Sequence, residues 1–136
     1  MKLVTYLNFD GNCREAMTFY KQCLGGELTI MPFSDMPGNP AKDQPDRVLH
    51  ASLDTKAGTI LMASDSMPGH PRQKATNFAV SVHCDSVEEI DRLFAAVGEK
   101  GKIEQPVSDT FWNARFGMLT DQFGIPWMFN HPYPPK

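Results

Sequence analysis

Four histidines, His50, His70, His83 and His131, are the side chains best suited to acid–base chemistry near neutral pH. His50 and His83 alternate with apolar residues in runs that predict β-strands, so each could point into a pocket. For His50, a role as general base or hydrogen-bond partner of a ligand competes with a purely structural role. For His83 the structural role is favoured. His70, in a Pro-Gly loop, and His131, near the chain end, are predicted to be ordinary solvated side chains.

Two other polar residues are candidate ligand contacts. Asp65 closes a predicted strand before a loop, where its carboxylate could orient a ligand or could stabilise the turn as a cap. Asn77 is expected on a strand, sharing a face with Ala79 and Ser81, so a polar contact with a ligand and a plain surface position both stay open.

Three aromatic residues near the end of the chain, Trp112, Phe116 and Trp127, could form one wall of a pocket or simply belong to the core. Arg115 could pair with an anionic ligand, although a surface salt bridge is the stronger expectation. The chain also has eight methionines, whose flexible thioethers suit a pocket that adapts to varied apolar ligands.

The cysteines Cys13, Cys23 and Cys84 are odd in number and widely spaced, with no Cys-x-x-Cys pair. This pattern is typical of buried, reduced thiols in the cytoplasm. A net charge of −3 without a basic cluster argues against nucleic acid as a partner. Neither a signal peptide nor an 18-residue apolar run is recognisable, so we expect a cytoplasmic protein with no membrane partner.

The first half of the chain predicts a strand, a helix and three further strands. The strands are expected at residues 2–9, 27–33, 47–54 and 59–64. Asn12 and Glu15 have the spacing of a capping box at the start of the helix, and Gly25-Gly26 ends it. Residues 34–46, rich in proline, predict a loop or lid, and residues 65–74 predict a linker.

The second half repeats this order. Strands are expected at residues 77–83, 102–107, 113–120 and 125–131, and a helix from Ser86 to Gly98 has a Ser86–Glu89 capping box. The chain therefore predicts a single α+β domain, 1–136, made of two βαβββ repeats at about 1–66 and 75–131. Paired modules would bring curved mixed sheets together as a cup with the helices outside.

The chain resembles the vicinal oxygen chelate superfamily (glyoxalase I, bleomycin-resistance proteins and extradiol dioxygenases) in YLNFDGNCREA (6–16), Phe19-Tyr20 and Leu24-Gly25-Gly26. It resembles the PhnB-like branch in MPFSDMP (31–37), His50-Ala51, Ser64-Asp65, Asn77-Phe78 and the run 109–117. The resemblance implies paired βαβββ modules, commonly a homodimer, and a label of 3-demethylubiquinone-9 3-methyltransferase-like domain. The chain lacks the Gly-rich strand-to-helix turn of a nucleotide-like cofactor site, so we expect no such cofactor.

Enzymes of this superfamily hold one divalent ion through four side chains, typically His, Gln or Glu. The matching positions here are Thr5, Met62 or a neighbour within 60–64, Asn77 and Met128. None of them is His, Glu or Asp, and methionine is a poor ligand for such an ion. The resemblance therefore predicts no metal and no other cofactor.

Three functions remain open. The leading hypothesis is a metal-free small-molecule-binding protein for an aromatic or amphipathic ligand, contacted by His50, Asp65, Asn77, Trp112, Phe116 and Trp127. The alternative is a glyoxalase- or dioxygenase-like enzyme acting on a small oxygenated or phosphonate-like metabolite. It would use His50 and Asp65 as acid–base groups or a metal bound elsewhere. A third hypothesis is an interaction module whose main event is dimerisation.

Overall fold

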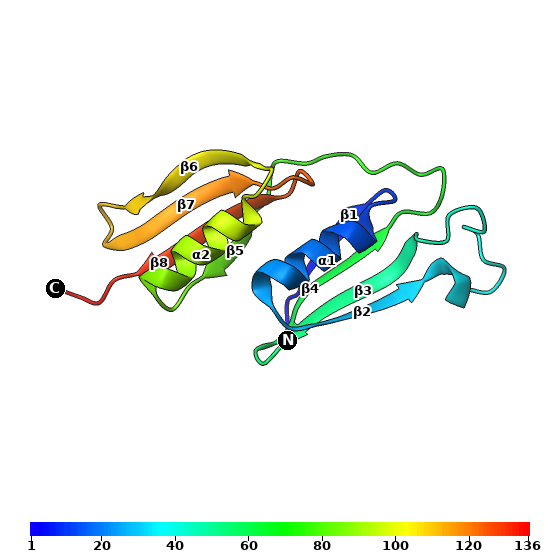
Figure 1. Cartoon of the computed structure of the whole chain (residues 1–136), viewed down its shortest axis with the longest axis horizontal. Helices are drawn as coiled ribbons and strands as arrows, with labels where there is room; N and C mark the ends of the chain where they lie inside the picture. The colour runs from blue at the N-terminus through cyan, green and yellow to red at the C-terminus, as the bar shows by residue number, and fades with distance from the viewer. The chain divides into compact units, whose positions relative to one another are not determined.

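The computed structural model describes residues 1–136, which divide into two compact units, Met1–Gln73 (unit 1) and Lys74–Lys136 (unit 2). Unit 1 contains β1 (Thr5–Phe9), α1 (Cys13–Leu24), β2 (Glu27–Pro32), the short 3-10 helix η1 (Phe33–Asp35), β3 (Val48–Thr55) and β4 (Gly58–Asp65). Unit 2 contains β5 (Val80–His83), α2 (Val87–Val97), β6 (Lys102–Asp109), β7 (Ala114–Thr120) and β8 (Pro126–Pro132). The predicted α+β architecture of two βαβββ modules is confirmed (Figure 1).

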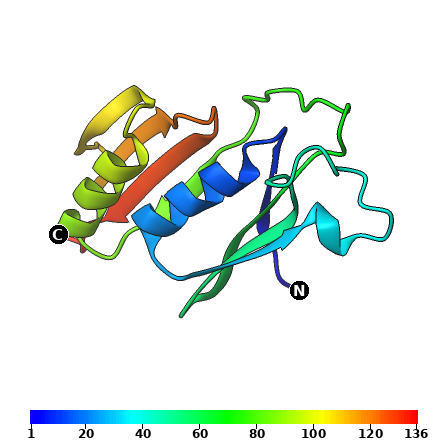
Figure 2. The ribbon, with the colours of Figure 1, turned by 45° about the vertical axis from the view of Figure 1, so that its right-hand side comes forward.

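Both four-stranded sheets have the same topology. The strand order is β1-β4-β3-β2 in unit 1 and β5-β8-β7-β6 in unit 2. The pairs β1–β4 and β5–β8 are parallel, and all other pairs are antiparallel. The first strand of each module is therefore an edge strand beside the last one, and the helix that follows it crosses one face of its own sheet (Figure 2).

Helix α1 buries an apolar stripe at helical spacing, formed by Cys13, Ala16, Met17, Tyr20 and Cys23. It ends at Gly25, whose φ of 80° is the left-handed conformation that glycine adopts without steric cost. The expected cap by Asn12 is wrong, because the Asn12 side chain makes no capping hydrogen bond. The N-terminal N–H groups are satisfied by a residue distant in sequence, described below.

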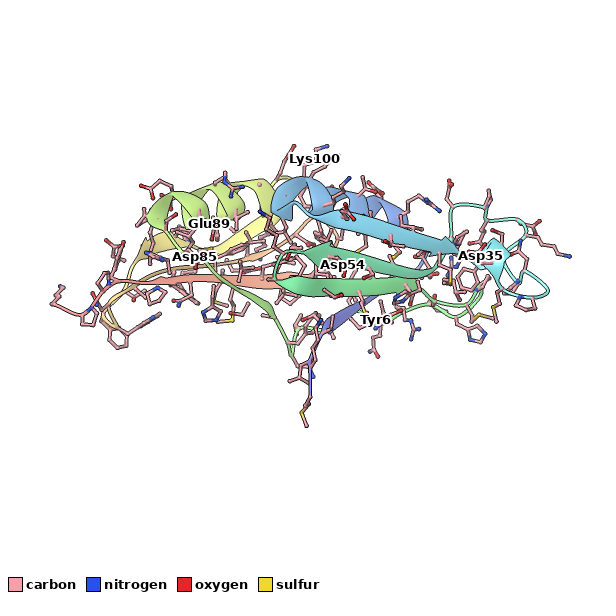
Figure 3. The ribbon with its side chains drawn as sticks, turned by 90° about the horizontal axis from the view of Figure 1, so that it is seen from below. Tyr6, Asp35, Asp54, Asp85, Glu89 and Lys100 are labelled. Atoms are coloured by element: carbon pink, nitrogen blue, oxygen red, sulfur yellow. The ribbon has the colours of Figure 1, made fainter.

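Helix α2 begins as predicted. The Ser86 hydroxyl accepts a hydrogen bond from the Glu89 N–H at 3.1 Å, and the Glu89 carboxylate accepts one from the Asp85 N–H at 3.0 Å. Asp85 and Glu89 are labelled at this end of the helix in Figure 3. The helix packs through Phe94 onto Gly117 of β7, where an added Cβ would lie 2.8 Å from the Phe94 ring. Glycine at this position lets α2 approach the sheet closely.

Burial alternates along the strands of unit 1. Leu7, Phe9, Leu53, Leu61 and Ala63 are buried on the face that carries α1. Because successive side chains point to opposite faces of a sheet, the residues between them lie on the other face. The same alternation in unit 2 buries Leu119, Trp127 and Phe129 on the α2 face.

One expected strand of unit 2 begins later than predicted. The strand expected at 77–83 begins only at Val80, so Asn77 lies outside it and is exposed. Trp112 lies in the turn between β6 and β7, just before the strand expected from residue 113. The turn is stabilised by Asn113, which has a φ of 61° and donates side-chain hydrogen bonds to the carbonyls of Tyr133 and Pro134.

The proline-rich loop 34–46 is anchored to the core by Arg47, which is only 5% exposed. Its guanidinium donates to the Ser66 carbonyl at 2.8 Å, the Gln44 side chain at 2.8 Å and the Asp10 carboxylate at 2.5 Å. The hydrogen bond from Arg47 holds the pKa of Asp10 below its usual value. The loop is therefore fixed at its base by charge-assisted hydrogen bonds.

Candidate functional site

The face of the unit 1 sheet opposite α1 is covered by no helix or strand of that unit, and we call it the open face. It is formed by Tyr6 and Asn8 from β1, Met62 and Ser64 from β4, His50, Ser52 and Asp54 from β3, and Glu27, Thr29 and Met31 from β2. The register places Tyr6, Met62 and Ser52 in one row across three strands, and Met31 beside His50. The face combines neutral polar groups with two carboxylates, Asp54 and Glu27, and two thioethers.

Tyr6 and His50 form a hydrogen-bonded pair on the open face. The phenol oxygen lies 3.0 Å from the imidazole Nδ1, and the ring centroids are 5.7 Å apart with a 31° tilt. Tyr6 is 43% exposed, and Figure 3 shows it on the side of its sheet away from α1. Whichever atom donates within the pair, the imidazole keeps Nε2 free to accept or donate a further hydrogen bond. The pair can therefore hydrogen-bond an oxygen atom placed beside it, or transfer a proton to that atom.

His50 is a candidate from the sequence, whereas Tyr6 is not among the residues that the sequence singles out. Tyr6 belongs to a predicted strand in which Val4 and Tyr6 occupy one face and Leu3, Leu7 and Phe9 the other, so the pattern favours burial of both faces. The signal that could have found it is parity, because Tyr6 and Asn8 alternate with the two buried residues.

Asp65 lies on the α1 side of the sheet and is only 3% exposed. Its Oδ1 accepts hydrogen bonds from the N–H groups of Gly11 at 2.7 Å and Cys13 at 3.0 Å, and its Oδ2 accepts from Val48 at 2.9 Å. The carboxylate thus caps the N-terminus of α1, where the helix dipole favours a negative charge. The structure places Asp65 in the cap role that the sequence had left as the alternative to ligand binding.

The aromatic residues of unit 2 separate into two environments. Trp112 packs edge-on against Phe111 and Phe116, with ring centroids 5.0 Å and 5.5 Å apart, and Phe111 and Trp112 are 97% and 49% exposed. Trp127 is buried on the α2 face, where its Nε1 donates to Asp121 Oδ2 at 2.8 Å. The structure therefore brings Trp112 and Phe116 together and places Trp127 in the core.

Arg115 is paired with two carboxylates. Its Nε lies 2.8 Å from Asp91 Oδ1 and its Nη1 lies 3.4 Å from Asp109 Oδ1. The hydrogen bond to Asp91, followed by the contact with Asp109, raises the pKa of Arg115. This is the surface ion pair that the sequence favoured over an anion-binding role.

The remaining histidines have different surroundings. His83 faces away from α2 and lies 3.4 Å from the Ser81 hydroxyl. The expectation that His131 is freely solvated is wrong, because its Nδ1 hydrogen-bonds the Cys84 carbonyl at 2.8 Å and its ring packs edge-on against Tyr133. His70 lies exposed in its loop.

The side chains present do not fit a divalent metal. No group of three or more His, Cys, Asp or Glu side chains is placed to hold one. Of the four positions matched by family resemblance, Thr5 shares its face with the buried Leu7, and Asn77 lies outside the strand. Met62 and Met128 point away from the helices, but they offer only thioether sulfur. These positions therefore offer no suitable ligand set for a divalent ion.

All three cysteines are buried and free, as predicted. Burial raises the pKa of the Cys13 thiol to about 12 and that of Cys84 to about 11. The reactive thiolate is therefore suppressed at neutral pH at both positions. Neither has the low pKa expected of a catalytic nucleophile.

Comparisons with known proteins agree with this architecture. The sequence model of the Glyoxalase/Bleomycin resistance protein/Dioxygenase superfamily matches residues 2–129. Protein YjdN from Escherichia coli (strain K12) is 37% identical over 142 residues, which cover 96% of this chain and 95% of YjdN. None of the helices is both long and apolar enough to cross a membrane.

Two solved structures are similar over nearly the whole chain. Protein PA1353 from Pseudomonas aeruginosa is 44% identical with a TM-score of 0.88, covering 97% of this chain and 98% of PA1353. The PhnB protein from Bacillus cereus is 29% identical with a TM-score of 0.79, covering 96% of this chain and 99% of that protein.

Proposed function

Because the chain belongs to the Glyoxalase/Bleomycin resistance protein/Dioxygenase superfamily, we propose that it is a metal-free small-molecule-binding protein whose ligand lies on the open face. The observation that carries this proposal is the Tyr6–His50 pair, which is held in place by its own hydrogen bond yet remains exposed. A polar pair beside apolar side chains is the usual composition of a small-molecule site.

The neighbours of the pair support an amphipathic ligand. Met31 is 44% exposed and lies beside His50 in the register, while Met62 lies beside Tyr6. Thioether side chains adapt their shape to an apolar surface. The ligand would place a hydrogen-bonding oxygen at Tyr6–His50 and its apolar part on the two methionines.

The other residues selected from the sequence take different parts in this proposal. His50 contacts the ligand directly, and Trp112 with Phe116 offers a second exposed aromatic surface. Asp65 and Trp127 support the two units from their buried positions. Asn77 is exposed and has no assigned part.

A second candidate function is an enzyme that uses the same pair in acid–base catalysis on a small oxygenated metabolite. The observation that favours it is the phenol–imidazole hydrogen bond, through which a proton could pass between the ligand and His50. Turnover of a bound metabolite by the wild type but not by His50→Gln would select this function over simple binding.

The binding proposal is tested by NMR of protein labelled at the tyrosine and histidine rings. Addition of an amphipathic alcohol is expected to shift the Tyr6 and His50 signals in a saturable manner. A dilution series without ligand supplies the control. If these two signals change with protein concentration instead, a second copy of the chain covers the open face, and the small-molecule proposal is contradicted.

We also expect a homodimer, formed through a surface other than the open face. Light scattering over a concentration series measures the mass. Dimer formation without any change at Tyr6 and His50 agrees with the proposal.

A further inference from the structure

The strands of unit 1 contain no lysine and no arginine. From this absence, together with two carboxylates on the open face, we infer that the ligand is uncharged or positively charged and is not a carboxylate, phosphate or phosphonate. The inference rests on the proposed binding function and specifies the chemical class of its ligand.

Recognition of an anion would need a cation that is free to bind it. Arginine does this best, because its planar guanidinium donates two parallel hydrogen bonds to carboxylate or phosphate oxygens. Arg47 is the arginine nearest to β3 in sequence, but it is 5% exposed and donates to Ser66, Gln44 and Asp10. It therefore has no exposed fork to offer a ligand.

The strands of unit 2 supply no better candidate. Arg115 is engaged by Asp91 and Asp109. Lys102 lies on the edge strand β6 with 78% of its side chain exposed, 3.9 Å from Glu104. The two strand cations of unit 2 thus each lie beside a carboxylate, and the strands of unit 1 supply no cation for an acidic ligand.

The open face carries negative charge at one end. Asp54 follows His50 by four residues on β3 and pairs in register with Glu27 of β2. The Asp54 carboxylate accepts hydrogen bonds from the hydroxyls of Ser52, at 3.4 Å, and Thr59. At the strand rise of about 3.3 Å per residue, the Cα atoms of His50 and Asp54 are separated by about 13 Å along β3.

This arrangement discriminates between ligands by charge. Two carboxylates repel an acidic ligand and attract a basic one, and the strands that form the face contain no lysine or arginine to offset them. The phenol and imidazole of the Tyr6–His50 pair suit a hydroxyl, ether or carbonyl oxygen. The preferred ligand has a neutral oxygen at one end, an apolar middle part and an uncharged or basic group at the other end.

Three matched probes test the inference. They are 6-(2-naphthyloxy)hexan-1-ol, 6-(2-naphthyloxy)hexan-1-amine and 6-(2-naphthyloxy)hexanoate, which share their apolar part and length and differ in charge. Their dissociation constants are measured from the Tyr6 and His50 NMR signals at low salt. We expect the amine to bind at least as tightly as the alcohol, and the hexanoate at least tenfold more weakly.

Variants identify the source of the preference. Asp54→Asn is expected to raise the dissociation constant of the amine about threefold to tenfold and to leave that of the alcohol unchanged. Glu104→Gln, which removes an exposed carboxylate from β6, is the matched control and should change neither. Thr29→Lys places a cation on the open face and should bring the hexanoate close to the affinity of the alcohol.

The outcomes separate the two proposals. Hexanoate binding at Tyr6 and His50 as tightly as the alcohol in the wild type would overturn the charge preference while leaving the binding function in place. If none of the three probes moves these signals, the binding function is contradicted, and the charge preference with it.

Discussion

Tyr6 and His50 lie on strands that are not neighbours, with β4 between them, yet the phenol oxygen is 3.0 Å from the imidazole Nδ1. The two side chains therefore span β4 on the face that also carries Met62. Neither depends on deep burial for its position, since Tyr6 is 43% exposed. The pair is fixed in geometry and still open to a ligand.

Removing either partner of the pair should weaken ligand binding without unfolding the protein. For Tyr6→Phe and His50→Gln we expect the dissociation constant of 6-(2-naphthyloxy)hexan-1-ol to rise about 2- to 12-fold, which corresponds to the loss of one net hydrogen bond. The free energy of unfolding should change by less than about 1 kcal/mol for either variant, because both side chains are partly exposed. Calorimetric titration and urea unfolding measure the two quantities.

Tyr133→Phe is the matched control for this prediction. It also removes an exposed phenol that hydrogen-bonds a side chain, in this case Asp109, but it lies in unit 2. Equal losses of affinity in Tyr6→Phe and Tyr133→Phe would show that the open face is not the binding surface.

Asp65→Asn should destabilise unit 1 strongly. The substitution turns one oxygen that accepts a backbone hydrogen bond into a donor and removes the charge at the start of α1. Buried hydrogen bonds to a charged group contribute about 1.5–3 kcal/mol each, so we expect a loss of about 2–4 kcal/mol in urea unfolding. Asp54→Asn, on the open face, should cost less than about 1 kcal/mol.

The Asp65→Asn variant also distinguishes a structural role of Asp65 from direct contact with a ligand. Under conditions where Asp65→Asn remains folded, its affinity for the alcohol probe should stay within about twofold of the wild type. A tenfold loss of affinity in the folded variant would return Asp65 to the ligand site.

The two tryptophans should report different environments. Trp112→Phe leaves only the buried Trp127, so its fluorescence should be blue-shifted and poorly quenched by acrylamide. Trp127→Phe leaves only the half-exposed Trp112, with red-shifted emission and efficient quenching. This second variant should also lose about 1–3 kcal/mol of stability, because Asp121 Oδ2 loses its indole donor. Similar quenching constants in both variants would contradict the placement of Trp127.

The buried thiols should make the protein less stable in alkali. The folded-state pKa is about 12 for Cys13, while the unfolded chain releases this proton near the ordinary value of 9.0. Above pH 9 the unfolded state therefore binds fewer protons than the native state, and the free energy of unfolding falls until the pH reaches the native pKa. Urea unfolding at pH 8, 9 and 10 measures the slope. Cys13→Ala should show a shallower decline than the wild type; identical slopes would argue against this assignment.

Local features of the fold were predictable, whereas contacts between distant residues were not. The cap of α2 was readable because Ser86 and Glu89 are three residues apart. The cap of α1 was not, because its acceptor, Asp65, lies 52 residues from Cys13 and only the parallel pairing of β1 with β4 brings it to the helix. In unit 2 the end of β8 that is comparable to the Asp65 end of β4 carries His131, whose imidazole hydrogen-bonds the Cys84 carbonyl.

The candidate site was predicted only in part for the same reason. Strand alternation was sufficient to select His50, but its partner Tyr6 is 44 residues away and is brought near by the sheet order β1-β4-β3. Residue type alone could not separate Trp112 from Trp127. Their difference depends on the turn at Asn113 and on the indole hydrogen bond to Asp121.

The most direct test of the central claim is equilibrium dialysis of the native protein against a bacterial metabolite extract, followed by mass spectrometry of the retained compounds. The wild type should concentrate at least one uncharged or basic amphipathic compound, and the double variant Tyr6→Phe/His50→Gln should lose it. Retention of the same compounds to the same extent by both proteins would contradict a ligand site at Tyr6 and His50.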